Sequence, residues 1–207
     1  MNRVLRVGLS ASIIFVLLLG ACVARAQDLA QDLGRAVLLI AAPDVEGPYA
    51  RTAVLAVPLG DKHFGLILNR ASAVTLAKLY PEHAASAKVL DPVYAGGAEM
   101  PNTLFALTRR DPGQPSLHLF GSLYLTGHAA VIDRIIEQTP NEARYFAGFV
   151  GWAPDELAEE IEAGDWYVAE ADESVVFRAD TSSLWEELVG RFSGEAHAAN
   201  FLRFPPG

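Results

Sequence analysis

The side chains that could carry chemistry in this 207-residue chain are few, and they are widely spaced along it. No two histidines have the i, i+4 spacing that a metal site on a single helix needs. The chain also lacks the glycine-rich loops that bind nucleotides and dinucleotide cofactors. We therefore interpret the histidines as surface or capping residues and expect neither a metal nor a cofactor. They are His63, His83, His118, His128 and His197.

A nucleophile with a partner base is not apparent either. Cys22 is the only cysteine and lies in an apolar opening segment, so no intramolecular disulfide can form. Ser122 follows Gly121 but lacks the second glycine of a G-x-S-x-G elbow. We therefore predict no catalytic residues and favour a protein that is not an enzyme.

Asn69 and Arg70 follow an apolar run and are candidates for contact with a ligand or a partner. A guanidinium group holds a carboxylate or a phosphate through two parallel hydrogen bonds. The alternative is that Arg70 pairs inside the fold with an acid such as Glu99 or Glu160. The sequence leaves both interpretations open.

Glycines border two of the expected strands. Gly96 and Gly97 follow a short strand, where they would let a ligand approach the backbone or would serve a turn or a bulge. Gly148 and Gly151 flank a turn, and small residues there let Trp152 pack beneath the neighbouring backbone. Gly96, Gly97 and Trp152 are therefore further candidates for contact with a ligand or partner.

The charge balance is acidic, which argues against one class of partner. The chain has 25 acidic and 16 basic residues, and three of the basic ones are arginines within residues 1–26, so 13 basic residues remain from residue 27 on. Nucleic-acid binding needs clustered lysine and arginine, and Arg109-Arg110 is the densest basic run. We expect no nucleic-acid partner. Five acids without a base in residues 155–162 fit a solvated face or a surface for a basic partner.

Residues 1–26 have the pattern of a secretory signal peptide. Arg3 and Arg6 precede an uncharged, mostly apolar run over Val7–Ala21, and small residues follow it. The run is shorter than the ~20 residues that a membrane-spanning helix needs. The pattern predicts an exported protein of a bacterial envelope rather than one held by a transmembrane helix.

The exit from this segment has two interpretations. Leu19–Cys22 resembles a lipobox, in which the Cys22 thiol receives a diacylglyceryl group and anchors the protein to the membrane. Ala24–Ala26 is an A-x-A site, and cleavage there would release a soluble periplasmic chain that starts at Gln27. Both remain open at this point.

The rest of the chain predicts one α+β domain with a mostly antiparallel sheet, because short strands outnumber single helices. We expect a tether over 27–35, the domain over 36–192 and a tail over 193–207. The predicted strands are Ala36–Ala42, Thr52–Val57, Phe64–Leu68, Val93–Ala95, Leu104–Leu107, Leu117–Leu119, Leu123–Leu125, Tyr145–Val150, Trp166–Ala169 and Val175–Phe177. The predicted helices are Thr75–Tyr80, Thr126–Gln138, Pro154–Ala163 and one opened by a capping box at Ser183 and Glu186.

Four motifs, taken together in order and spacing, resemble the YqgE/AlgH family over roughly residues 35–190. The most specific of them is the glycine–tryptophan–proline block of 146–154. The motifs are Ala36–Pro43, Phe64–Arg70, Tyr94–Gly97 and Phe146–Pro154. The resemblance implies a compact α+β domain whose bent, mostly antiparallel sheet closes into a pseudo-barrel. It implies no catalytic residue and no cofactor.

The chain also departs from the family pattern. Ala71 stands where the family has proline after Asn-Arg, and most members lack an export signal. We expect an exported accessory protein that binds an envelope protein or a small ligand without catalysis. One alternative is a hydrolase with a cleft near Asn69, Arg70 and Gly97. The other is a transcriptional regulator, which rests on a label that some family members carry.

Overall fold

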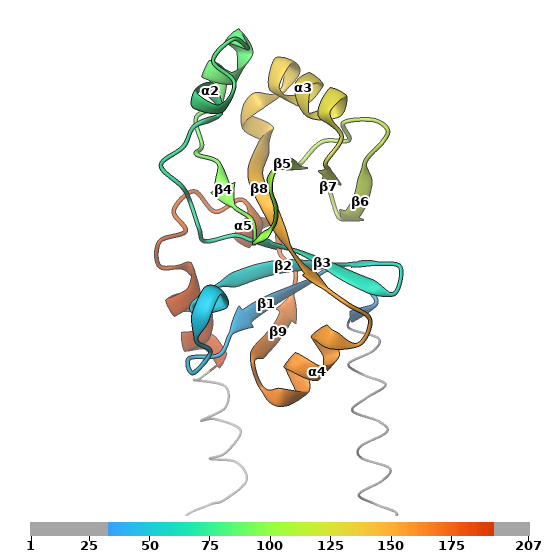
Figure 1. Cartoon of the computed structure of the whole chain (residues 1–207), viewed down its shortest axis with the longest axis vertical. Coiled ribbons are helices and arrows are strands. Elements are labelled where there is room, and N and C mark those ends of the chain that lie inside the picture. The colour runs from blue at the N-terminus through green and yellow to red at the C-terminus, as the bar shows by residue number, and fades with distance from the viewer. Residues whose placement is uncertain (1–32, 193–207) are drawn as a thin grey trace, which may run out of the picture.

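A computed structural model describes residues 33–192, and a nine-stranded sheet dominates them (Figure 1). The strands follow the order β6-β7-β5-β8-β3-β2-β1-β9, and β4 pairs with β8 beside this path. Every pairing is antiparallel except β4 with β8. The strands are β1 Val37–Ala41, β2 Ala53–Leu59, β3 Lys62–Ile67, β4 Tyr94–Ala95, β5 Glu99–Thr108, β6 Leu117–Phe120, β7 Leu123–Thr126, β8 Ala143–Trp152 and β9 Trp166–Glu170.

Short helices connect and cover the sheet. They are α2 Leu76–Leu79, α3 Ala129–Gln138, α4 Glu156–Ala163 and α5 Glu173–Val176, with 3-10 turns η1 Gly47–Tyr49, η2 Ala84–Lys88 and η3 Pro140–Glu142. Residues 184–192 are also helical. Among the described helices, none has both the length and the apolar character to cross a bilayer. This arrangement confirms the predicted α+β domain with a bent, mostly antiparallel sheet.

The predicted signal peptide over 1–26, most of the tether and the tail over 193–207 lie outside the described residues. Cys22 and His197 therefore lie outside them too.

The central strands are buried on both faces, which explains their continuous apolar sequences. In β1, Leu38 and Ile40 point into one core, while Val37, Leu39 and Ala41 point into a second core on the opposite face. Helix α4 covers the second core, and the 184–192 helix packs in the first. The predicted strand over Ala36–Ala42 is thus confirmed, along with the reason for it.

Strand β8 joins the two halves of the sheet and bends between them. Its first part pairs with β5 from Ala143↔Thr108 to Ala147↔Leu104, and its last part pairs with β3 from Val150↔Gly65 to Trp152↔His63. Gly148 lies between the two parts with a φ of 72°, a left-handed backbone conformation that favours glycine. The bend gives the sheet its half-barrel curvature (Figure 1).

A third core lies between the β5–β8 half of the sheet and α3. Ile132, Ile135 and Ile136 of α3 are buried in it, and the polar face of the helix turns outward. The helix begins at Ala129 rather than at the predicted Thr126. Thr126 still belongs to β7, and its hydroxyl accepts a hydrogen bond from the His128 amide.

The predicted strand over Val175–Phe177 is wrong, since α5 occupies Glu173–Val176. The Asp172 carboxylate accepts a hydrogen bond of 2.8 Å from the Ser174 amide and so starts a helical turn. A three-residue apolar run fits a helix as well as a strand, and Val176 is buried in either case. The local capping side chain decided between the two.

The last helix forms where it was predicted but starts differently. The Ser183 hydroxyl donates to the Glu187 carboxylate, and Glu186 binds Arg51. The predicted capping box would have used Ser183 and Glu186 on the helix's own backbone. A local contact four residues along the chain takes the Ser183 side chain, and a tertiary contact takes that of Glu186.

Candidate functional site

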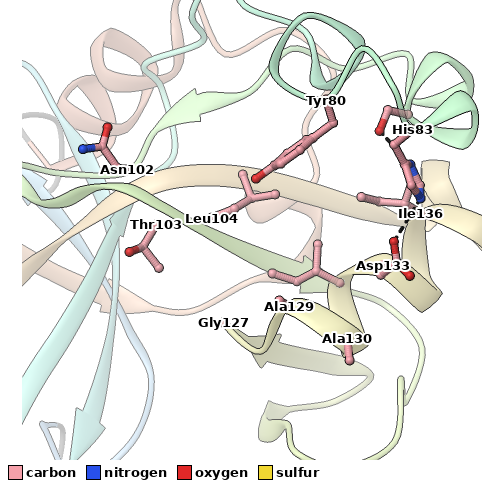
Figure 2. A pocket seen from close by; sticks show the side chains of 12 residues that line it. Tyr80, His83, Asn102, Thr103, Leu104, Gly127, Ala129, Ala130, Asp133 and Ile136 are labelled. Carbon is pink, nitrogen blue, oxygen red and sulfur yellow. Dashed lines mark hydrogen bonds and ion pairs between the residues drawn. The ribbon is translucent and has the colours of Figure 1, made fainter.

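A cavity with a volume of about 570 Å³ opens between η2, β5 and α3 (Figure 2). We call it the cleft. Its size falls in the range of about 300–1,000 Å³ that is usual for small-molecule sites. Each of the elements β5 and α3 contributes both polar and apolar residues to the lining. The polar lining residues are Tyr80, His83, Ser86, Asn102, Thr103 and Asp133, and the others are Leu104, Gly127, Ala129, Ala130, Ile132 and Ile136.

His83 connects the two walls of the cleft. Its Nε2 lies 2.9 Å from Asp133 Oδ1 and 3.3 Å from Glu137 Oε1, and its Nδ1 lies 2.9 Å from Ser86 Oγ. Ionised carboxylates only accept hydrogen bonds, so Nε2 must carry the proton. Asp133 and Glu137 are four residues apart on α3 and therefore share one face of that helix. His83 thereby holds the η2 segment against α3.

The contacts of Ser86, His83 and Asp133 resemble a hydrolytic triad, because one ring nitrogen faces a hydroxyl and the other faces a carboxylate. A nucleophile must reach the carbon that it attacks. Ser86, however, has a relative accessibility of 0%. The hydroxyl therefore satisfies the histidine inside the wall, and the arrangement serves positioning rather than nucleophilic attack.

Three polar side chains of the lining have no hydrogen-bond partner among residues 33–192. In the described part of the chain, the Tyr80 hydroxyl, the Asn102 amide and the Thr103 hydroxyl make no hydrogen bond to protein. Exposed polar groups exchange these bonds with water, and a ligand can replace that water. The cleft therefore combines unpartnered polar groups with apolar side chains.

Asn69, one of the candidates predicted from the sequence, uses its side chain to bind two backbone groups. Its Oδ1 accepts from the Ala53 amide at 3.0 Å, and its Nδ2 donates to the Arg51 carbonyl at 2.9 Å. These bonds set the start of β2 against the end of β3. Both ends of the amide are therefore occupied by the chain itself.

Arg70 is half-buried, and within residues 33–192 it forms no ion pair, whether with Glu99 or with Glu160. It lies close enough to Tyr49 to act on it electrostatically. Burial, followed by the charge of Glu99, raises the pKa of the Tyr49 hydroxyl, and the positive charge of Arg70 opposes that rise. Of the two interpretations left open by the sequence, the pairing of Arg70 with an internal acid is not seen among the described residues.

Trp152 and Glu160 are hydrogen-bonded to each other. Trp152 is 3% exposed, and its Nε1 donates to Glu160 Oε2 at 2.8 Å. Trp166 Nε1 donates to the same oxygen at 2.7 Å, and the two indole rings meet edge to face at 6.2 Å. One carboxylate from α4 therefore satisfies two buried indoles.

Gly96 and Gly97 lie where two backbones cross. A Cβ on Gly97 would fall well inside van der Waals contact with the Phe149 carbonyl group, and one on Gly96 would do so with the Gly148 oxygen. Gly96 also donates to Ala147 O at 2.8 Å. The pair allows close backbone approach along β8.

These tightly packed residues lie along β8, and we call them the seam. The seam consists of Gly96, Gly97, Gly148, Trp152 and Glu160. Of the candidates predicted from the sequence, Gly96, Gly97 and Trp152 lie in this seam. Asn69 and Arg70 lie just past the end of β3. The cleft is built from other residues. Sequence reasoning missed the cleft because His83 and Asp133 are 50 positions apart. The available signal was the i, i+4 pair of acids on α3.

Over residues 33–192, no group of three acidic, histidine or cysteine side chains is arranged to hold a metal ion. The fold and the cleft together define a single-domain α+β half-barrel protein with a small-molecule-sized cavity at one end of the sheet (Figures 1 and 2).

Comparison with known proteins identifies the family. The family model described as AlgH-like matches residues 38–197, and the chain belongs to this family. A UPF0301 protein of Thermobifida fusca is 30% identical over 185 residues, covering 81% of this chain and 92% of the relative. A UPF0301 protein of Chlorobium phaeobacteroides is 27% identical over 164 residues, covering 77% and 86%. The predicted family is therefore confirmed.

Two solved structures share the fold. Protein DIP2367 of Corynebacterium diphtheriae is 26% identical with a TM-score of 0.62, over 76% of this chain and 86% of that one. The AlgH protein of Pseudomonas aeruginosa is 24% identical with a TM-score of 0.64, over 76% and 87%. Both support the curled half-barrel arrangement described above.

Proposed function

We propose that this protein is a non-catalytic binding domain that takes a small ligand in the cleft between η2 and α3. The observation that carries the proposal is the lining of the cleft. Among the described residues, the polar groups of Tyr80, Asn102 and Thr103 lack protein partners, and the same lining includes the apolar side chains of Ile132 and Ile136. Figure 2 shows the cleft from close by. Sites for small molecules typically combine a few convergent polar groups with an apolar surface.

The proposal is tested by screening a small-molecule library with ligand-observed NMR on residues 27–207 and on two tryptophan variants. Ala130→Trp places an indole in the cleft from an exposed position of α3. Ala163→Trp adds the same group at an exposed position of α4, at the far end of the molecule (Figure 1), and is the matched control. Compounds that bind the parent and Ala163→Trp but not Ala130→Trp are expected. An empty screen, or compounds that bind Ala130→Trp equally well, would refute the proposal.

The same proposal places the protein outside the cytosol, in a bacterial envelope, where a protein partner would also be met. The support is the signal-like sequence of residues 1–26, with either a lipid anchor on Cys22 or a soluble chain from Gln27. Intact mass of protein from the membrane fraction separates a diacylated Cys22 start from a Gln27 start. Full-length chain with Met1 in the cytosol would contradict export.

The two alternatives gain no observation in their favour. A hydrolase centred on Asn69, Arg70 and Gly97 would need groups free to act, but the Asn69 amide and the Gly97 backbone are engaged in the fold. A transcriptional regulator would have to bind DNA with a net charge of −9.

A further inference from the structure

We infer that the ligand of the cleft is an organic cation, an ammonium group on a short apolar body. This inference rests on the proposed binding function and adds the chemical class of the ligand. Three features of the described residues point to it, namely the charge of the wall, the direction of the nearby basic side chains, and the aromatic ring at the opening.

The group formed by His83 and its two carboxylate partners has a net negative charge in either protonation state of the histidine. Asp133 lines the cleft, and Glu137 lies beside it at 3.3 Å from His83 Nε2. With a neutral imidazole the group carries two negative charges, and with an imidazolium it carries one. The lining contains no lysine or arginine to offset that charge.

Lys88 of η2 is exposed and does not line the cleft, and two other nearby basic side chains contact backbone carbonyls outside it. The Lys78 ammonium lies 3.5 Å from the Ala73 carbonyl oxygen. On α3 itself, Arg134 donates to the Pro112 carbonyl at 2.7 Å and lines a separate depression. An anionic ligand would therefore meet carboxylates in the cleft without a compensating cation.

Tyr80 supplies the remaining contact. The residue is 44% exposed, and its hydroxyl end points towards Leu104 (Figure 2). An ammonium group is attracted to the face of an aromatic ring. The lining of the cleft thus includes both a carboxylate and an aromatic ring for the charged end of the ligand, and apolar side chains for the other end.

The strength of the preference follows from exposure. The Asp133 and Glu137 side chains are 63% and 53% exposed, so water screens their charge. We therefore expect selectivity of severalfold rather than of many orders of magnitude.

The test uses three probes that share a six-carbon chain, hexylammonium, hexanol and hexanoate. Binding is followed by protein-observed NMR at the amides of Thr103, Gly127 and Ile132, which report on the cleft. Hexylammonium is expected to shift these amides with a dissociation constant of about 1 mM. Hexanoate is expected to bind at least about fivefold more weakly, with hexanol between them.

Two variants assign the effect to the wall. Asp133→Asn keeps an acceptor for His83 and is expected to weaken hexylammonium about threefold while leaving hexanol unchanged. Glu159→Gln removes the same charge from an exposed site on α4 and is expected to change nothing. Equal binding of all three probes in the cleft, or stronger binding of hexanoate, would overturn the charge inference and leave the proposed binding function standing. No shift with any probe would overturn the inference as well, while the library screen would still decide the binding function.

Discussion

The seam along β8 and the cleft beneath α3 use polar and small residues in opposite ways. At the seam, one Glu160 oxygen satisfies two buried indoles, and glycines let backbones touch. At the cleft, the polar groups of Tyr80 and Asn102 have no partner in the described part of the chain, and a cavity remains beside them. The motifs that are typical of the family therefore specify the fold at the seam. The proposed binding site lies elsewhere, in residues that no motif marks.

The largest effect is expected from Gly97→Ala in the seam. The new methyl group would collide with the Phe149 carbonyl group, which is backbone and cannot move aside cheaply. We expect the free energy of unfolding in urea to fall by about 4 kcal/mol or more. Gly190→Ala is the matched control, because nothing lies near that position in its helix, and it should be neutral or slightly stabilising. Equal stability of the two variants would contradict the explanation that a steric collision requires glycine in the seam.

Glu160→Ala tests the polar part of the seam. It leaves two buried indole N–H groups without an acceptor, and we expect a loss of about 2–3 kcal/mol in the free energy of unfolding. Glu160→Gln keeps one acceptor oxygen and should lose about half as much. Glu162→Ala, at an exposed position of the same helix, is the control. A loss no greater in Glu160→Ala than in Glu162→Ala would show that the shared carboxylate is unimportant.

His83→Ala is the corresponding test at the cleft, and it should cost less than either seam variant. The change leaves the buried Ser86 hydroxyl without its partner and releases η2 from α3. We expect a loss of about 1–2 kcal/mol and faster amide hydrogen exchange in η2. His118→Ala, at an exposed position where the ring contacts a turn carbonyl and the Tyr124 ring, should lose less than about 0.5 kcal/mol. Unchanged exchange in η2 would contradict the bridging role.

The smallest expected effect on stability comes from an exposed ion pair that lies outside both the seam and the cleft. It therefore serves as a reference for both regions. Hydrogen bonds from Arg178 and then from Ser183 lower the pKa of Glu187 from 4.5 to about 2. A lowered pKa in the folded state gives stability that is complete above pH 4.5 and is lost as the pH falls towards about 2.

Glu187→Gln should therefore flatten that part of the acid dependence of the urea midpoint and leave the neutral-pH behaviour of the cleft and seam variants unchanged. An acid dependence identical to that of the parent would assign the dependence to other carboxyl groups.

Local patterns predicted much of the sheet. Continuous apolar runs located β1 and β2 because these strands are buried on both faces. Strands β5 and β8 are longer than predicted, since polar residues and Gly148 interrupt their apolar runs, and their pairing resumes at Glu99 and Phe149 beyond an irregularity. The resemblance to the family supplied the curvature, which no local pattern contained.

The site was less accessible to sequence reasoning. Asn69, Gly97 and Trp152 were correctly noticed as unusual, but their types alone do not tell whether the fold or a ligand uses them. His83 looked like an isolated histidine because its partners on α3 are 50 or more positions away.

The sequence by itself determined which strands lie inside, the acidic surface charge and the family, because these follow from composition and from patterns over a few residues. Only the tertiary structure decided that His83 meets Asp133 and Glu137 and that a cavity stays open beside them. The physical reason is that hydrogen bonding and burial depend on where distant parts of the chain meet. That meeting is set by the path of the whole sheet.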